Sequence, residues 1–272
     1  MLADSHIHLF SNGYKDSGED ELSLYKALMD QYAIECALIV GYEGAPWAMG
    51  NNKYIASLLP LNPWMHPLAF VGPADLSINT LKNFQSMGFE GISIYLNSTT
   101  EVEALSLVDT SVWEWLTKEN WIVSVNSVAQ LWLVWLEILK KFPHLIMLIS
   151  HFGLPEIDTK RTQNKEIESQ FHAIAQLLEF ENVYLKLSGF YALETEPSPY
   201  PFTELNSHIE YVVKTFNPNR LLWGSDFTPV LGSIEFQQTF DHLLDLPAVD
   251  PSLLSKILHD NLVNLFNQSP PQ

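Results

Sequence analysis

The chain has 272 residues, a length that suits one large domain or two small ones. Hydrophobic residues make up 47% of the sequence and charged residues 17%, a composition that excludes an intrinsically disordered protein. The formal net charge of −18 opposes contact with phosphate backbones, so we expect no nucleic-acid partner.

The sequence also lacks the marks of export and of membrane insertion. No apolar run reaches the roughly 18 uncharged residues that a transmembrane helix requires. Residues Met1–Asp4 contain neither a basic region nor the start of a signal-peptide core. We therefore expect a cytoplasmic protein without a membrane partner. The single cysteine, Cys36, excludes a disulfide framework and a cysteine-based zinc site.

Eight short runs are nearly continuous in apolar residues, which is typical of strands covered on both faces in a parallel sheet. These predicted strands are Leu2–His8, Glu35–Gly41, Leu68–Pro73, Gly91–Leu96, Trp121–Asn126, Leu145–His151, Val183–Ser188 and Arg220–Asp226. Amphipathic stretches lie between them and predict helices. One such stretch repeats apolar residues every three positions, at Leu81, Phe84 and Met87, and stops at Gly88.

Eight strands that alternate with helices over about 250 residues predict an α/β fold, the (β/α)8 or TIM barrel, in a distorted form. We expect one barrel domain over residues 1–267, followed by a frayed tail at residues 268–272. The main alternative is an open, doubly wound sheet. The strand count and the absence of a G-x-G-x-x-G turn in the sequence argue against it.

Two histidines, His6 and His8, end the first predicted strand. Side chains at positions i and i+2 point to the same side of a strand, so both imidazoles face one way and Ile7 faces the other. The carboxyl ends of the strands form the active-site mouth of a parallel barrel. Two imidazoles there can hold a divalent metal or form a hydrogen-bonded pair, while the alternative is a pair of structural histidines.

Two further residues lie at the same predicted end of the barrel. His151 ends the sixth strand and Asp226 ends the eighth, which neighbours the first strand in a closed barrel. Each residue also has a structural alternative: Asp226 can be a helix N-cap, and His151 a buried core histidine. The coincidence of all four residues at one end favours a functional site.

Several segments together resemble the amidohydrolase superfamily, in its amidohydrolase-related "type 2" branch of TIM-barrel hydrolases. The matching segments, in order, are Asp4–Phe10, Ser150–Pro155, Asn182–Gly189, Arg220–Asp226 and Ile257–Leu262. The resemblance covers nearly the whole chain. The segments H-F-G-L-P and K-L-S-G are most similar to the sugar-lactonase and dicarboxylate-lactonase subgroup.

The resemblance implies hydrolysis of a lactone or another cyclic ester at the barrel mouth. By matching position, Asp226 would be the general base that activates water, and His6, His8 and His151 would bind a metal or polarise the carbonyl. A base near the water and positive or donor groups near the oxyanion are what ester hydrolysis needs. The catalytic residues are thus expected to be Asp226 and His151.

The departures from the family pattern limit the number of metal ions that the site is expected to hold. Asn126 stands where many metal-using relatives carry a histidine after the fifth strand, and the fourth strand, Gly91–Leu96, ends without a bridging lysine or a following arginine. A two-metal site is therefore not expected. His6, His8 and Asp226 form the expected set for one divalent ion, zinc or manganese. A metal-free site remains the alternative.

The loops after the strands supply the expected substrate contacts, namely Tyr42, Trp47, Tyr95, Asn126 and Tyr191. Glu43 is either an additional ligand or a solvated carboxylate, and the role of Lys186 stays open. The expected partner is a small-molecule substrate, and the sequence leaves a homo-oligomer open. The alternative functions are a metal-dependent decarboxylase of the same branch and a non-catalytic barrel that binds a ligand.

Overall fold

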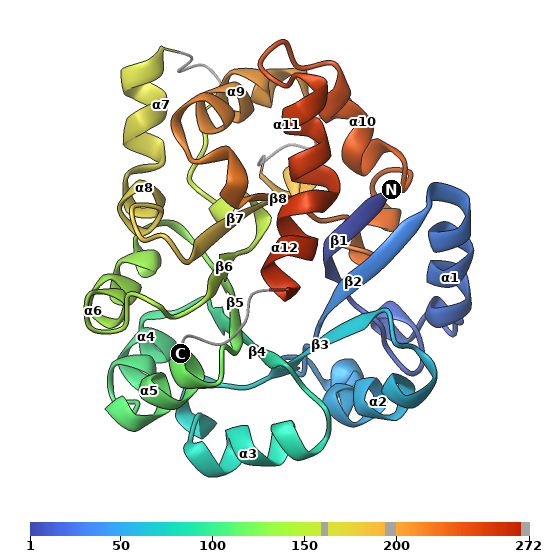
Figure 1. Ribbon diagram of the computed structural model, residues 1–272, viewed down its shortest axis with the longest axis vertical. Helices are drawn as coiled ribbons and strands as arrows, with labels where there is room; N and C mark the ends of the chain where they lie inside the picture. Colours follow the sequence, from blue (N-terminus) through green and yellow to red (C-terminus); the bar gives the residue numbers. More distant parts are fainter. Residues whose placement is uncertain (159–162, 194–199, 268–272) are drawn as a thin grey trace.

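The computed structural model describes residues 1–158, 163–193 and 200–267. The expected tail at residues 268–272 lies outside these ranges. Eight parallel strands follow one another around a barrel in sequence order (Figure 1). They are β1 (Leu2–Ile7), β2 (Ile34–Val40), β3 (Met65–Phe70), β4 (Gly91–Leu96), β5 (Ile122–Ser127), β6 (Met147–Ile149), β7 (Val183–Leu187) and β8 (Leu221–Trp223). The predicted TIM-barrel fold is confirmed.

The barrel closes between β1 and the residues that follow β8. The backbone N–H of Asp226 donates to the carbonyl of His6 at 2.9 Å, and Ile7 forms a parallel bridge with Phe227. The buried carboxylate of Asp4 adds a side-chain link, since Oδ1 accepts from the N–H of Ser225 at 2.9 Å. These bonds exclude the open doubly wound sheet, and they join the two chain segments that carry His6, His8 and Asp226.

Helices surround the strands, as Figure 1 shows. They are α1 (Glu21–Tyr32), α2 (Asn51–Leu58), α3 (Ile78–Ser86), α4 (Thr99–Ser106), α5 (Thr110–Lys118), α6 (Val134–Lys141), α7 (Asn164–Gln170), α8 (His172–Leu177), α9 (Asn206–Thr215), α10 (Gln238–Leu244), α11 (Pro251–Ser255) and α12 (Asn261–Phe266). The predicted stop at Gly88 follows α3 closely and has a φ of +94°. Among the described residues, no helix combines the length and apolar character that crossing a membrane would require.

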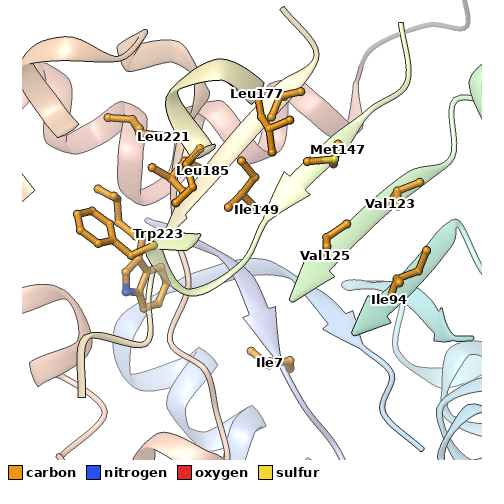
Figure 2. Packing of buried hydrophobic residues seen from close by; sticks show 14 of the residues in the cluster. Ile7, Ile94, Val123, Val125, Met147, Ile149, Leu177, Leu185, Leu221 and Trp223 are labelled. Carbon is orange, nitrogen blue, oxygen red and sulfur yellow. The ribbon is translucent and has the colours of Figure 1, made fainter. Parts of the chain in front are cut away.

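The side chains of alternate strand residues point into two different apolar layers. Ile7, Val125, Ile149 and Trp223 belong to the layer between the strands and the helices, which Figure 2 shows in part. The intervening residues point into the barrel, where the amino-terminal half is filled by aliphatic side chains such as Leu38. This alternation explains why Ile7 packs outward while His6 and His8 point inward.

The last helix, α12, closes the amino-terminal end of the barrel. It lies beside β1 and β8 in Figure 1. Its side chains Leu262 and Leu265 join the apolar cluster inside the barrel, and the ring of Phe266 stacks on His66 in β3 with 3.5 Å between the ring centroids. The barrel interior therefore has an apolar floor at this end, and its polar residues lie toward the opposite end.

Three predicted strand bounds were wrong for identifiable reasons. The third strand begins at Met65 and not at Leu68, because Pro67 pairs within β3 through its carbonyl, which accepts from the N–H of Glu90 at 3.0 Å. The sixth and eighth strands end at Ile149 and Trp223, before His151 and Asp226. Both His151 and Asp226 adopt left-handed backbone conformations, with φ of +51° and +60°. Those conformations depart from the extended backbone of a strand, and the two side chains lie at the mouth.

Candidate active site

The two histidines of β1 meet Asp226 inside the carboxyl-terminal end of the barrel. His6 Nε2 lies 3.1 Å from His8 Nε2, and Asp226 Oδ1 lies 3.7 Å from His6 Nε2 and 3.6 Å from His8 Nε2. His6, His8 and Asp226 are all buried. The structure therefore brings Asp226 together with two histidines that stand more than two hundred positions earlier in the sequence.

His8 is held in one tautomer by the end of β2. Its Nδ1 lies 2.7 Å from the carbonyl oxygen of Val40, which can only accept, so Nδ1 carries the proton and Nε2 presents a lone pair toward Asp226. Burial lowers the pKa of His8 to about 4. His8 is thus a neutral imidazole at neutral pH, and its unprotonated Nε2 faces His6 and Asp226.

Asp226 occupies a buried position with one oxygen bonded and one oxygen free. The phenol of Tyr191 donates to Oδ2 at 2.5 Å, whereas Oδ1 has no hydrogen-bond partner among the described residues. Burial raises the pKa of Asp226 above its ordinary value, although His8, the Tyr191 hydrogen bond and Lys186 act in the opposite direction. The side chain does not cap a helix, since the short helical turn at Pro229–Gly232 has Thr228 at its N-cap position.

His151 approaches the same group from the end of β6. Its Nδ1 lies 3.9 Å from Asp226 Oδ2 and 3.4 Å from the hydroxyl of Ser188, and its ring centroid is 4.5 Å from that of His6. A Cβ at Gly189 would lie 2.7 Å from His151 Nδ1, so only glycine leaves room for the imidazole there. Burial lowers the pKa of His151 to about 3.

Lys186 is buried beneath the site, next to His6. Its Nζ donates to the hydroxyl of Ser124 at 2.8 Å and lies 3.2 Å from His6 Nδ1, and the side chain is fully buried. Burial lowers the pKa of Lys186 to about 7. Burial and the nearby Lys186 also lower the pKa of His6 well below its ordinary value. The K-L-S-G segment thus places Lys186, Ser188 and Gly189 around the two histidines.

A cavity of about 450 Å³ opens above these groups. Among the expected substrate contacts, Tyr42, Trp47, Tyr95 and Asn126 line it, together with His8, His151 and Asp226. Tyr191 does not line the cavity and instead holds Asp226. His6 is likewise absent from the lining and lies deeper. The cavity is of the size that small-molecule sites have.

Sequence reasoning missed part of the cavity wall. Phe10, Tyr14 and Lys15, in the loop after β1, also line it. Their position just beyond the carboxyl end of a strand was the available signal, because such loops build the mouth of a barrel. Glu43 is not at the site, since its Oε1 accepts from the N–H of Asn52 at 2.8 Å at the start of α2.

Basic side chains are scarce around the cavity. In the part of the chain that the structure describes, Lys15 is the one lysine or arginine in the lining. Arg220 lies at the opposite end of the barrel, where its guanidinium donates to the carbonyls of Phe180 and Val183. Arg161, the other arginine of the sequence, lies outside the described residues.

The donor set of His6, His8 and Asp226 fits a single divalent ion. One ligand atom from each residue can be chosen so that all three lie within 4.8 Å of one another. Bonds of roughly 2.0–2.2 Å to a tetrahedral ion would place neighbouring ligand atoms roughly 3.4 Å apart, close to the 3.1–3.7 Å found. The unpartnered Oδ1 of Asp226 is the atom that such an ion would satisfy.

Comparisons with known proteins agree with this architecture. The chain aligns over 98% of its length with 99% of a probable 2-pyrone-4,6-dicarboxylic acid hydrolase from Acinetobacter baumannii, solved with citric acid bound, at 19% identity and a TM-score of 0.73. It aligns over 99% with all of a zinc-bound amidohydrolase from Burkholderia multivorans, at 12% identity and a TM-score of 0.76. At these identities the likeness shows the fold alone.

A third solved structure, an amidohydrolase 2 from Bifidobacterium longum subsp. infantis, shares 18% identity and a TM-score of 0.69 over 98% of this chain and 99% of its own. A search of the curated proteins finds no match. The family model for amidohydrolases of the second type matches residues 3–267, which confirms the resemblance seen in the sequence segments. The chain therefore belongs to the amidohydrolase family.

Proposed function

We propose that this hydrolase opens a lactone or a similar cyclic ester, with Asp226 as the general base. One observation carries the proposal: a buried carboxylate with a free oxygen faces neutral imidazoles at the base of a small-molecule cavity. A carboxylate whose pKa is raised by burial accepts a proton more readily than an ordinary aspartate. The chain's membership of the amidohydrolase family supports hydrolysis, and we infer that the bond it hydrolyses is a cyclic ester.

The reaction would begin with a water molecule in the cavity beside the Asp226 carboxylate. Asp226 takes a proton from the water as the water oxygen forms a bond to the ester carbonyl carbon. His151, which lines the cavity, polarises the carbonyl oxygen on which negative charge develops. The ring C–O bond then breaks, and Asp226 returns the proton to the departing alkoxide. Tyr191, bonded to Oδ2, fixes the orientation of the Asp226 carboxylate.

His6, His8 and Asp226 would hold one divalent ion, with zinc or manganese suited to two imidazoles and a carboxylate. Such an ion would supply Lewis acidity at the ester carbonyl. The fixed tautomer of His8 favours this role, because a histidine that ligates a metal usually donates its other N–H to a carbonyl or a carboxylate.

Removal of the metal is expected to abolish activity. Native protein that is purified without chelator should contain about one zinc or manganese ion per chain, because three protein donors suit a single ion. Prolonged treatment with EDTA should lower kcat at least about 100-fold, and added zinc should restore it. Elemental analysis and turnover measure the two effects. Protein without stoichiometric metal that keeps its activity in EDTA would establish the metal-free alternative.

The substrate is expected to be neutral or singly charged. Lys15 is the one lysine or arginine in the described lining of the cavity, and a protein with a net charge of −18 repels anions. We expect kcat/KM for neutral lactones to exceed that for 2-pyrone-4,6-dicarboxylate by roughly tenfold.

A lactone panel read by a pH indicator tests both the reaction and this preference. The panel contains δ-valerolactone, glucono-1,5-lactone, dihydrocoumarin and 2-pyrone-4,6-dicarboxylate. Acid release by the wild type, with none by heat-unfolded protein, supports the proposal. Failure to open any of these lactones at micromolar protein would refute lactone hydrolysis, and faster opening of the dicarboxylate would refute the charge preference.

A further inference from the structure

The buried carboxylate of Glu21 joins the two loops that frame the cavity. Its side chain, at the first residue of α1, is 1% exposed. Oε2 accepts from the N–H of Phe10 at 2.6 Å, and Oε1 accepts from the N–H of Tyr14 and from the hydroxyl of Thr228, each also at 2.6 Å. The acidic run Asp16–Glu21 is typical of a solvated loop and helix start, but Glu21 itself is buried.

The first of these loops carries the aromatic wall of the cavity. The ring of Phe10 stacks nearly parallel to the imidazole of His8, at 5.9 Å and 16°. Trp47 packs edge-on against both Phe10 and Tyr14, with ring centroids 4.8 and 5.1 Å apart. The position of this wall therefore depends on the backbone at Phe10 and Tyr14, which is the backbone that Glu21 holds.

The second loop carries Asp226. Thr228 is the second residue after Asp226 and is buried. The carbonyl of Asp226 accepts from the N–H of Val230 at 3.1 Å, so these residues form one turn. A hydrogen bond from Thr228 to a charged partner is among the stronger ones in proteins. Glu21 thereby connects the turn that carries Asp226 with the loop that carries the aromatic wall.

The capping of α1 does not account for Glu21. The neighbouring Asp20 is the N-cap, and its carboxylate accepts from Ser23 N at 3.1 Å and from Ser23 Oγ at 2.7 Å while exposed to solvent. A buried carboxylate loses solvation and is retained only when its oxygens are well bonded. Three donors from the two loops around the cavity supply those bonds.

We propose that Glu21 is a positioning residue of the active site: it sets the aromatic wall through Phe10 and Tyr14, and the Asp226 turn through Thr228. This inference rests on the function proposed above. It assigns Glu21 no contact with the substrate. The two effects can be measured separately. The aromatic wall contacts the substrate and affects KM, whereas the turn positions Asp226 and affects kcat.

Amide exchange tests the arrangement without any substrate. In Glu21→Gln the amide group replaces one accepting oxygen by a donor, which cannot accept the N–H groups. We expect exchange in the peptide covering residues 9–15 to accelerate about tenfold or more, as expected when a hydrogen bond to a charged group is lost. Asp20→Asn is the matched control, because it removes the same charge one residue away and should leave that peptide unchanged.

Kinetics with the fastest lactone of the panel test the consequences. Glu21→Gln should raise KM about tenfold more than Asp20→Asn does. Thr228→Val, which removes only the hydroxyl, should lower kcat about tenfold with KM within about twofold, and Thr228→Ser should restore kcat. If Glu21 and Thr228 had only a structural role, their substitution would lower the melting temperature. It would not raise KM in Glu21→Gln and lower kcat in Thr228→Val.

The outcomes separate this inference from the proposed function. Equal exchange rates at residues 9–15 in Glu21→Gln and Asp20→Asn would overturn the inference, and so would wild-type kcat in Thr228→Val. If Glu21→Gln does not fold, Thr228→Val and Thr228→Ser still decide. If no lactone is opened, the proposed function fails, whereas exchange in the 9–15 and 226–233 peptides of the same variants still tests the Glu21 links.

Discussion

Asp226→Asn is expected to keep the fold and to lower kcat by roughly 100- to 10,000-fold, the range that loss of acid–base catalysis gives. An amide can still accept the hydrogen bond from Tyr191, so the side chain should stay in place. It cannot take a proton from water. The loss should lie at the upper end if Asp226 also holds an ion, because the base and the electrophile would then be lost together.

The pH profile gives the same experiment a second measurement. A general base must be ionised, so wild-type kcat should fall as the pH drops through the pKa of Asp226. Without a bound ion, burial raises that pKa and places the acid limb above the ordinary value for aspartate, whereas an ion held by Asp226 would lower the pKa and move the limb to lower pH. The residual activity of Asp226→Asn should lack this limb. Near-native turnover by a folded Asp226→Asn protein would disprove the mechanism.

Asp4→Ala is expected to destabilise the barrel by about 4 kcal/mol, because it leaves several buried donors without partners. Asp4 Oδ1 accepts from the N–H groups of Ser225 and His6, and Oδ2 accepts from the phenol of Tyr25 at 3.0 Å. These bonds join β1 to the residues after β8 and to α1. Urea unfolding followed by circular dichroism measures the loss.

Asp4→Asn is the matched control for that experiment. Its amide oxygen can accept both N–H groups, and its NH2 group can donate to the Tyr25 oxygen. Burial raises the pKa of Asp4 to about 6, so the site already disfavours the charged form, and a neutral amide should cost less than about 1 kcal/mol. Equal losses in the two variants would show that the hydrogen bonds of Asp4 do not stabilise closure.

The sequence predicted the barrel because its strands are covered on both faces. Continuous apolar runs such as Gly91–Leu96 occur where one face meets the helices and the other fills the interior. The predicted strand ends were less accurate at Asp226 and His151, since the hydropathy pattern does not indicate a left-handed backbone conformation. The inward direction of His6 and His8 followed from strand alternation alone.

The loop residues could not be predicted with the same accuracy. Phe10, Tyr14 and Lys15 follow β1, but their entry into the cavity depends on a loop path that local sequence does not encode. The sequence does not indicate that Glu21 is buried, because its hydrogen-bond donors come from three separate positions. Lys186 had no assignable role, since its partner His6 is 180 residues away. The positions and roles of these residues depend on tertiary contacts.

The apolar floor that α12 gives the barrel has a kinetic consequence. Leu262 and Leu265 fill the amino-terminal end, so the cavity above His8 and Asp226 is a dead end on that side. A substrate and the hydroxy acid formed from it would have to pass the same aromatic wall in opposite directions. The product would thus occupy the place of the next substrate, and its inhibition would be competitive.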